Sequence, residues 1–261
     1  MRRALDALRS EDGRRHLGQL PTVRRAREVA AAWPEPPAGQ DSVAGPNPLR
    51  ELHAAHGSGA GLYKWEHYLD VYHRHLARFR GREVHVCEVG VHGGGSLQLW
   101  HDYFGPGCRV VGIDVLEECR SLADDRTTIV IGDQEDRALW RRLRDEHPPF
   151  DVVIDDGGHQ AGQQVVTLEE ALPHLNPGGV YVCEDVHRAT NEFGAYLRAL
   201  SSQLDAGDRA ERPGGGLEIA ASPFQRAVAS VHLYPFLAVV ETNPSPVDRF
   251  VAEPRGTDWP G

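Results

Sequence analysis

Short apolar segments alternate with longer amphipathic ones through the middle of the chain, and this alternation limits the fold more than any other feature. The apolar segments have the length of buried strands, and segments with helical spacing, about 10 to 15 residues long, separate them. Such an order produces right-handed crossovers and a parallel sheet with helices on both faces. We therefore expect an α/β fold with a doubly wound sheet. The expected strands are Glu83–Val89, Arg109–Asp114, Thr128–Ile131, Phe150–Asp155 and Gly179–Cys183.

Two further apolar segments near the end of the chain flank a tight turn. Ala229–Tyr234 and Leu237–Glu241 predict an antiparallel hairpin. A mostly parallel, seven-stranded sheet that ends in such a hairpin is similar to the Rossmann-like class I methyltransferases rather than to the dehydrogenases. The expected helices around this sheet are Tyr63–Arg80, Ser96–Tyr103, Glu117–Ala123, Glu135–Glu146, Gln163–Leu175 and Glu192–Leu204.

The first 48 residues differ in composition from the rest. Residues 1–33 carry eight arginines against four acids, and their leucines recur at helical spacing with interruptions at Gly13 and Pro21. The stretch 34–48 is rich in Pro, Gly, Ala and Ser and has too few large apolar residues to pack. We expect residues 1–48 to form one or two short helices and a linker, either a solvated arm or an oligomerisation element. Residues 49–261 should form one domain.

A second glycine-rich stretch, Asp205–Gly216, follows the last expected helix. A stretch of this kind forms either a plain surface loop or a lid over a site. Both interpretations stay open.

The composition excludes several classes of partner. Hydrophobic residues make up 40% of the chain and charged residues 25%, as in ordinary globular proteins. The net charge of −10 argues against nucleic acid or an anionic membrane as the main partner. The sequence has no secretion signal and no run near the roughly 18 apolar residues that span a membrane. Four cysteines without C-x-x-C spacing predict free thiols, so we expect a cytoplasmic protein, and we expect it to be a homo-oligomer.

A glycine loop follows the first expected strand, where folds of this class bind a nucleotide. In the frame of the dinucleotide fingerprint G-x-G-x-x-G, Gly90 and Gly95 match, but His92 replaces the second glycine. That glycine lets the backbone approach a pyrophosphate, and an imidazole would obstruct it. The loop therefore disfavours NAD.

S-adenosylmethionine has no phosphate and needs a glycine-rich turn together with an acid for its ribose hydroxyls. Asp114 ends the second strand, 24 residues after Gly90, where a carboxylate could accept both hydroxyls. Asp133 and Gln134 follow the third strand and could accept from the adenine amino group. We expect S-adenosylmethionine as the cofactor.

The fourth and fifth strands both end in acids. Asp156 and the pair Glu184-Asp185 follow these strands, and ligands bind at the carboxyl ends of parallel strands. Three carboxylates would repel one another, and no Lys or Arg stands in either motif. A divalent cation resolves the repulsion, and oxygen ligands favour Mg²⁺, with Mn²⁺ or Ca²⁺ as substitutes. In the alternative interpretation one acid lines the cofactor site and the others cap helices.

His159 follows Asp156 by three residues. Beside a metal-bound hydroxyl, an imidazole can take the proton as the methyl group arrives, which predicts a general base. A structural or solvent-exposed histidine is the alternative in a chain with 14 histidines. His187 is a second candidate for contact with the substrate.

Together these motifs resemble those of the magnesium- and S-adenosylmethionine-dependent O-methyltransferases of natural-product biosynthesis. That family acts on sugars of macrolides and related glycosides, and it shares a fold with cephalosporin-hydroxylase-like proteins. The likeness covers about residues 52–259. It is carried by Glu88-Val89-Gly90-Val91, Gly93-Gly94-Gly95-Ser96-Leu97, Gly132-Asp133-Gln134, Ile154-Asp155-Asp156-Gly157-Gly158-His159, Glu184-Asp185-Val186-His187, Val231-His232-Leu233-Tyr234, Val239-Val240-Glu241 and Arg255-Gly256-Thr257-Asp258-Trp259.

The resemblance implies that Asp156, Glu184 and Asp185 hold the metal and that His159 is the base. The chain departs from the family upstream, where relatives tend to have Gly-Thr-Asp-Lys and this chain has Gly61-Leu62-Tyr63-Lys64. The cofactor contacts that the resemblance implies are Lys64, Glu88, Gly90, Gly94, Ser96, Asp114, Asp133 and Gln134.

The leading hypothesis is an O-methyltransferase that acts on a sugar hydroxyl of a secondary metabolite. A protein that binds S-adenosylmethionine for a regulatory or hydroxylase-associated role, without methyl transfer, is the second. An NAD-dependent enzyme is the third, and His92 speaks against it.

Overall fold

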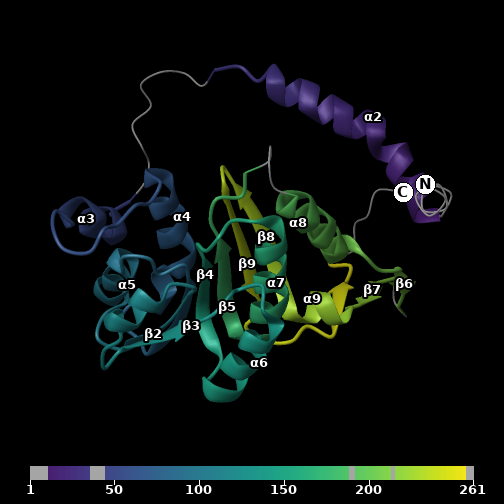
Figure 1. Ribbon diagram of the computed structural model, residues 1–261. Helices are drawn as coiled ribbons and strands as arrows, with labels where there is room; N and C mark the ends of the chain where they lie inside the picture. Colours follow the sequence, from purple (N-terminus) through teal and green to yellow (C-terminus); the bar gives the residue numbers. More distant parts are fainter. Residues whose placement is uncertain (1–10, 36–44, 188–191, 213–214, 257–261) are drawn as a thin grey trace. The chain divides into compact units, whose positions relative to one another are not determined.

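The computed structural model describes residues 11–35, 45–187, 192–212 and 215–256, and the side chains of 11–20 are not among them. The start of the expected arm, most of the expected linker and the motif residues 257–259 lie outside this range. The chain divides into two compact units, Met1–Gly45 and Pro46–Gly261 (Figure 1). Among the described residues, no helix is long and apolar enough to cross a membrane.

The described residues of the first unit include the helix α2 (Glu11–Ala31), with Pro21 inside it. The expected interruption at this proline is wrong. A proline removes one backbone hydrogen bond, but the turns on both sides of it can stay helical. The described side chains of α2, from residue 21 onward, are exposed.

The second unit is built on a seven-stranded sheet with the order β3-β2-β1-β4-β5-β9-β8. The first five strands are parallel, and β9 runs antiparallel to both β5 and β8. The strands are β1 (Val84–Val89), β2 (Cys108–Asp114), β3 (Thr127–Ile131), β4 (Phe150–Asp155), β5 (Leu175–Cys183), β8 (Val228–Tyr234) and β9 (Leu237–Thr242). The doubly wound sheet and its closing hairpin are those expected from the sequence.

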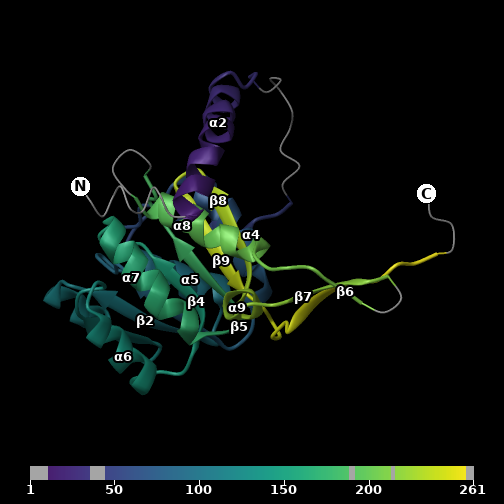
Figure 2. The ribbon, with the colours of Figure 1, turned by 90° about the vertical axis from the view of Figure 1, so that its right-hand side faces the viewer.

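Helices cover both faces of this sheet, as Figures 1 and 2 show. Alternate residues of one strand therefore enter different cores: Val152 and Ile154 pack in one, and Val153 packs in the other. Side chains of α3, α4 and α5 fill the first core, and those of α6, α7 and α8 fill the second. The helices are α3 (Pro48–Ala55), α4 (Glu66–Leu76), α5 (Gly95–Phe104), α6 (Arg137–Glu146), α7 (Ala161–Ala171), α8 (Phe193–Ser201) and α9 (Pro223–Ala227).

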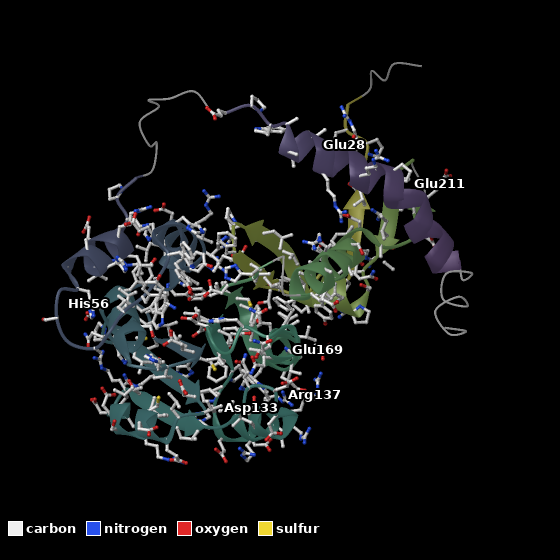
Figure 3. All side chains as sticks on the ribbon, turned by 45° about the horizontal axis from the view of Figure 1, so that its top comes forward. Glu28, His56, Asp133, Arg137, Glu169 and Glu211 are labelled. Atoms are coloured by element: carbon white, nitrogen blue, oxygen red, sulfur yellow. The ribbon has the colours of Figure 1, made fainter. Side chains whose placement is uncertain are left out.

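Ion pairs on the surface add to the packing of α6 against α7. Arg137 pairs with Glu169 and Glu170. Figure 3 labels Arg137 and Glu169. Arg144 also pairs with Glu170 at 2.7 Å. Ion pairs that stay in contact with solvent contribute little individually.

A small second sheet was not expected. It has the order β10-β7-β6 and consists of β6 (Ala210–Glu211), β7 (Leu217–Ala220) and β10 (Arg249–Ala252). In Figure 2, β6 and β7 extend away from the large sheet. The stretch Asp205–Gly216, expected to be a loop, thus contains strand β6. Whether it serves as a lid stays a prediction.

Candidate active site

A cavity of about 730 Å³ opens at the carboxyl ends of the parallel strands. Its volume lies within the roughly 300 to 1,000 Å³ that is usual for small-molecule sites. Ten of the twelve site residues expected from the sequence line it. These ten are Lys64, Gly90, Ser96, Asp114, Asp133, Gln134, Asp156, His159, Glu184 and Asp185.

The glycine loop forms one wall of the cavity because other segments of backbone press against it. Gly90 has φ +88°, and a Cβ atom there would lie 2.0 Å from the carbonyl oxygen of Asp156. At Gly95 a Cβ would lie 2.2 Å from the carbonyl oxygen of Gly61. The loop therefore needs glycine at both positions, independently of any ligand.

Asp114 is the last residue of β2, and its carboxylate holds the glycine loop through hydrogen bonds to the loop's backbone. Its Oδ2 accepts from the backbone N–H groups of Val91 and His92 at 2.9 and 2.8 Å, and Oδ1 accepts from Leu116. Asp133 occupies the corresponding position after β3, where its Oδ1 accepts from the N–H of Glu135. Both carboxylates line the cavity.

Three of the expected cofactor contacts have other partners. Gln134 is buried and donates to Asp155 and Thr167. Glu88 is fully buried and accepts from Ser96 and Trp100. Burial raises the pKa of Glu88 to about 7, although Lys64 opposes the shift. Neither Glu88 nor Gly94 is among the residues that line the cavity.

Lys64 lies between the acids at the other end of the cavity. Its Nζ is 2.5 Å from Oδ2 of Asp156 and 2.5 Å from Oε1 of Glu184, and its side chain is 2% exposed. Burial alone would lower the pKa of Lys64, but the charges of Glu184, Asp156 and Glu88 outweigh it and raise this pKa. The lysine stays charged and supplies part of the counter-charge that the acidic motifs lack.

Helix α4 supplies two tyrosines to the same acids. The hydroxyl of Tyr72 donates to Oε1 of Glu184, the oxygen that Lys64 also contacts. The hydroxyl of Tyr68 lies 3.0 Å from Oδ1 of Asp185, and Trp65 donates to that oxygen at 3.1 Å. These contacts leave Oδ2 of Asp185 directed toward another group.

That other group is His159, two residues before the start of α7. Its Nε2 lies 3.6 Å from Oδ2 of Asp185 and 3.9 Å from Oδ1 of Asp156. His187 lies 3.6 Å from Oδ1 of Asp185. His159 and Asp185 have φ of 57° and 53°, and His92 in the glycine loop has 46°. This left-handed conformation is strained for residues with a side chain.

The arrangement fits a divalent cation. One donor atom each from Asp156, His159 and Asp185 lies within 4.8 Å of the others. Asp156, Glu184 and Asp185 carry three negative charges when ionised, and Lys64 cancels one, so two remain for a cation of charge +2. Oε1 of Glu184 already accepts from Lys64 and Tyr72. Glu184 is therefore a weaker candidate for a metal ligand than Asp156 and Asp185.

The counter-charge that Lys64 provides was not predicted from the sequence. Lys64 lies 92 and 120 residues from its two partners, so neither acidic motif contains it. One signal was present, because Lys64 is the only lysine beside 27 arginines. Tyr68 and Tyr72 lie within the expected helix Tyr63–Arg80, and no motif marked them as site residues.

Residues 87–186, which contain most of this cavity's lining, match a family model described as a methyltransferase domain. The expected Rossmann-like methyltransferase fold is confirmed, because the same sheet is found in solved methyltransferases. The MycE methyltransferase from the mycinamycin biosynthetic pathway, solved with Mg, SAH and mycinamycin VI, superposes with a TM-score of 0.61 at 25% identity. The match covers 92% of this chain and 61% of that one.

Two relatives of the methyltransferase domain come from Streptomyces olivaceus. The 8-demethyl-8-α-L-rhamnosyl tetracenomycin-C 2′-O-methyltransferase is 36% identical over 214 residues, or 74% of this chain and 54% of the relative. The 8-demethyl-8-(2-methoxy-α-L-rhamnosyl)-tetracenomycin-C 3′-O-methyltransferase is 40% identical over 152 residues, or 55% and 38%. The chain thus spans about half the length, or less, of these curated relatives.

Proposed function

We propose that the protein is an S-adenosylmethionine-dependent O-methyltransferase that acts on a sugar hydroxyl of a glycosylated natural product. The observation that carries the proposal is the continuity of the cavity. It runs from the glycine loop and Asp114 at one end to Asp156, His159 and Asp185 at the other. A methyl donor and a hydroxyl acceptor could therefore meet inside one enclosure.

At the cofactor end, Asp114 would accept the ribose hydroxyls. Two of its hydrogen bonds already fix the glycine loop, so the carboxylate is held in place before a ligand arrives. Val115 and Leu116, exposed by 64% and 45%, line the same end and offer apolar contact to an adenine ring. Asp133 would accept from the adenine amino group.

At the acceptor end, Asp156 and Asp185 would hold a divalent cation, with Glu184 beside them and His159 facing both. When bound, S-adenosylmethionine supplies an electrophilic methyl group, and the cation makes a hydroxyl more acidic and orients it. Lys64 keeps Asp156 and Glu184 in place through its two ion pairs. Trp65 and Tyr68 fix the rotamer of Asp185 through its Oδ1.

His159 would accept the proton of the acceptor hydroxyl at Nε2. This atom faces the space between Asp156 and Asp185, where the hydroxyl would lie. The carboxylate of Asp185, 3.6 Å away, would stabilise the imidazolium that forms. The two tetracenomycin relatives are named for the 2′ and 3′ oxygens of a rhamnosyl group, which supports a deoxysugar hydroxyl as the acceptor.

The test is direct conversion. The protein is incubated with S-adenosylmethionine, Mg²⁺ and 8-demethyl-8-α-L-rhamnosyl tetracenomycin C, and mass spectrometry follows the methylated glycoside and S-adenosylhomocysteine. We expect both products in equal amounts, and a turnover roughly 10² to 10⁴ times lower in His159→Ala.

The matched control is His187→Ala, because His187 contacts the same carboxylate from the other side. It should retain most of the turnover. If the protein binds S-adenosylmethionine but methylates no rhamnoside or related glycoside, the proposal is wrong and a binding role without methyl transfer replaces it.

A further inference from the structure

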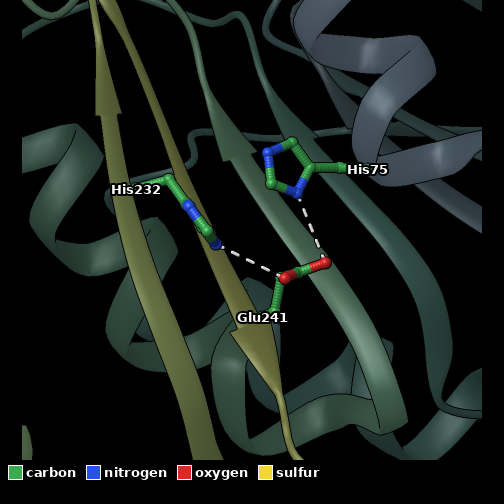
Figure 4. Close-up of side chains that lie close together, drawn as sticks. All are labelled: His75, His232 and Glu241. Carbon is green, nitrogen blue, oxygen red and sulfur yellow. Dashed lines mark ion pairs between the residues drawn. The ribbon is translucent and has the colours of Figure 1, made fainter.

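A second group of metal-ligating side chains lies away from the cavity. His75 comes from the last turn of α4, and His232 and Glu241 come from β8 and β9. One donor atom of each lies within 4.8 Å of the others (Figure 4). Glu241 pairs with Val180 in the sheet, whereas Cys183, next to the cavity, pairs with Ala238. Glu241 is thus three residues further along β9 than Ala238, the residue beside the cavity, which corresponds to about 10 Å.

The nitrogen–oxygen distances in this group are longer than those of most hydrogen bonds. Nδ1 of His75 lies 3.3 Å from Oε1 of Glu241, and Nε2 of His232 lies 3.4 Å from Oε2. Hydrogen bonds between nitrogen and oxygen are usually about 2.7 to 3.2 Å long. Ligands at roughly 2.0 to 2.1 Å in a tetrahedron around zinc lie about 3.3 to 3.4 Å from one another. Each histidine thus lies at about this ligand spacing from one oxygen of Glu241, His75 from Oε1 and His232 from Oε2.

The surroundings also prepare these side chains as ligands. The other ring nitrogen of His75 lies 2.9 Å from the hydroxyl of Tyr234, and a partner of this kind orients metal-binding histidines. The Ser230 hydroxyl lies 2.9 Å from Nε2 of His232 and 3.3 Å from Oε2 of Glu241, so one more oxygen is at hand.

We propose that His75, His232 and Glu241 form a binding site for a transition-metal dication, with Zn²⁺ as the best match. Two imidazoles with one carboxylate suit zinc, cobalt or nickel, and they suit magnesium poorly. The site is distinct from the acidic cluster at the cavity. A bound ion would join α4 to the hairpin of β8 and β9, and α4 also carries Tyr68 and Tyr72.

Arg78 is the competitor for this site. Its guanidinium donates to Oε1 of Glu241 at 2.8 Å and to the carbonyl of Gly178 at 2.9 Å. The Arg78 side chain is 43% exposed and can turn into water, whereas the Glu241 side chain is 20% exposed. Arg78→Gln should therefore tighten zinc binding, an effect that a purely structural network would not produce.

The experiment is equilibrium dialysis of the untagged full-length protein against Zn²⁺, in excess Mg²⁺ to occupy the acidic cluster. We expect one Zn²⁺ per chain, and a rise in Tm of roughly 5 °C at a hundredfold excess over Kd. His232→Ala and Glu241→Gln, both at partly exposed side chains, should weaken binding by at least about 100-fold. His159→Ala should bind as the wild type does.

Three outcomes would overturn the site. The wild type takes up no Zn²⁺, or His232→Ala and Glu241→Gln bind it unchanged, or His159→Ala abolishes the binding. The third would assign the ion to the acidic cluster. Because zinc uptake is measured without substrate, its failure would leave the proposed methyl transfer untouched.

Discussion

The two ends of the cavity are held together in different ways. At the cofactor end, Asp114 bonds to Val91, His92 and Leu116, all within 24 residues of chain. At the acceptor end, Lys64 reaches Asp156 and Glu184 across 92 and 120 residues. The first end depends on one strand-helix-strand unit, β1-α5-β2, whereas the second depends on the docking of α4 and the segment before it.

This difference predicts which substitutions each end of the cavity tolerates. A locally built cofactor end should keep its affinity when the rest of the site is altered. An acceptor end held by distant side chains should lose turnover through substitutions that never touch the cofactor. Four substitutions test the contrast, in order of decreasing effect.

Asp156→Asn should have the largest effect. It removes the carboxylate that would face both the cation and His159, and we expect turnover to fall on the order of 10³-fold with excess Mg²⁺. The affinity for S-adenosylhomocysteine, measured by calorimetry, should change less than about twofold. An equal loss in both quantities would contradict the separation of the two ends.

Lys64→Met should lower the free energy of unfolding by about 3 to 5 kcal/mol, because it leaves Asp156 and Glu184 without their counter-charge. Urea denaturation measures it. The matched control is Arg50→Met, whose partner Asp70 is 44% exposed and whose loss should cost at most about 1 kcal/mol. Equal costs for the two variants would show that the Lys64 contacts are not important for stability.

Glu88→Gln tests a buried acid behind the cofactor end. The pKa of Glu88 is raised from 4.5 to about 7, so between these pH values the folded state keeps a proton that the unfolded state has lost. The free energy of unfolding should therefore fall as pH rises through this range, by up to about 3 kcal/mol in total. Denaturation at pH 5 and pH 8 should show a smaller fall in the variant, and an identical fall would refute the assignment to Glu88.

Asp114→Asn should have the smallest effect on catalysis. Loss of hydrogen bonds to a charged carboxylate should weaken S-adenosylhomocysteine binding about 10- to 100-fold, with little change in kcat at saturation. Calorimetry and initial rates measure the two quantities. A fall in kcat without a change in affinity would place Asp114 at the wrong end of the cavity.

The sequence predicted what is periodic and local. The strand Phe150–Asp155 appears with the expected bounds, and the closing hairpin extends one residue further than expected at each end. These elements are predictable because burial on one or both faces fixes their pattern. The short strands β6 and β7 were missed because their residues are mostly exposed and show no such pattern.

The acceptor end of the cavity could be predicted only in part from the sequence. Asp156, Glu184 and Asp185 follow adjacent parallel strands, so their convergence follows from the topology. The position of Lys64 depends on how the segment before α4 docks, and no periodicity encodes that docking. The metal and proton roles of these residues stay predictions.

The left-handed residues around the cavity have a consequence for engineering. His92, His159 and Asp185 each hold a backbone conformation that glycine would adopt at lower cost, with strain on the order of 1 to 3 kcal/mol per residue. A selection for heat resistance alone would favour glycine at these positions and discard the imidazoles and the carboxylate. Any thermostable variant of this chain should therefore be screened for turnover at every round.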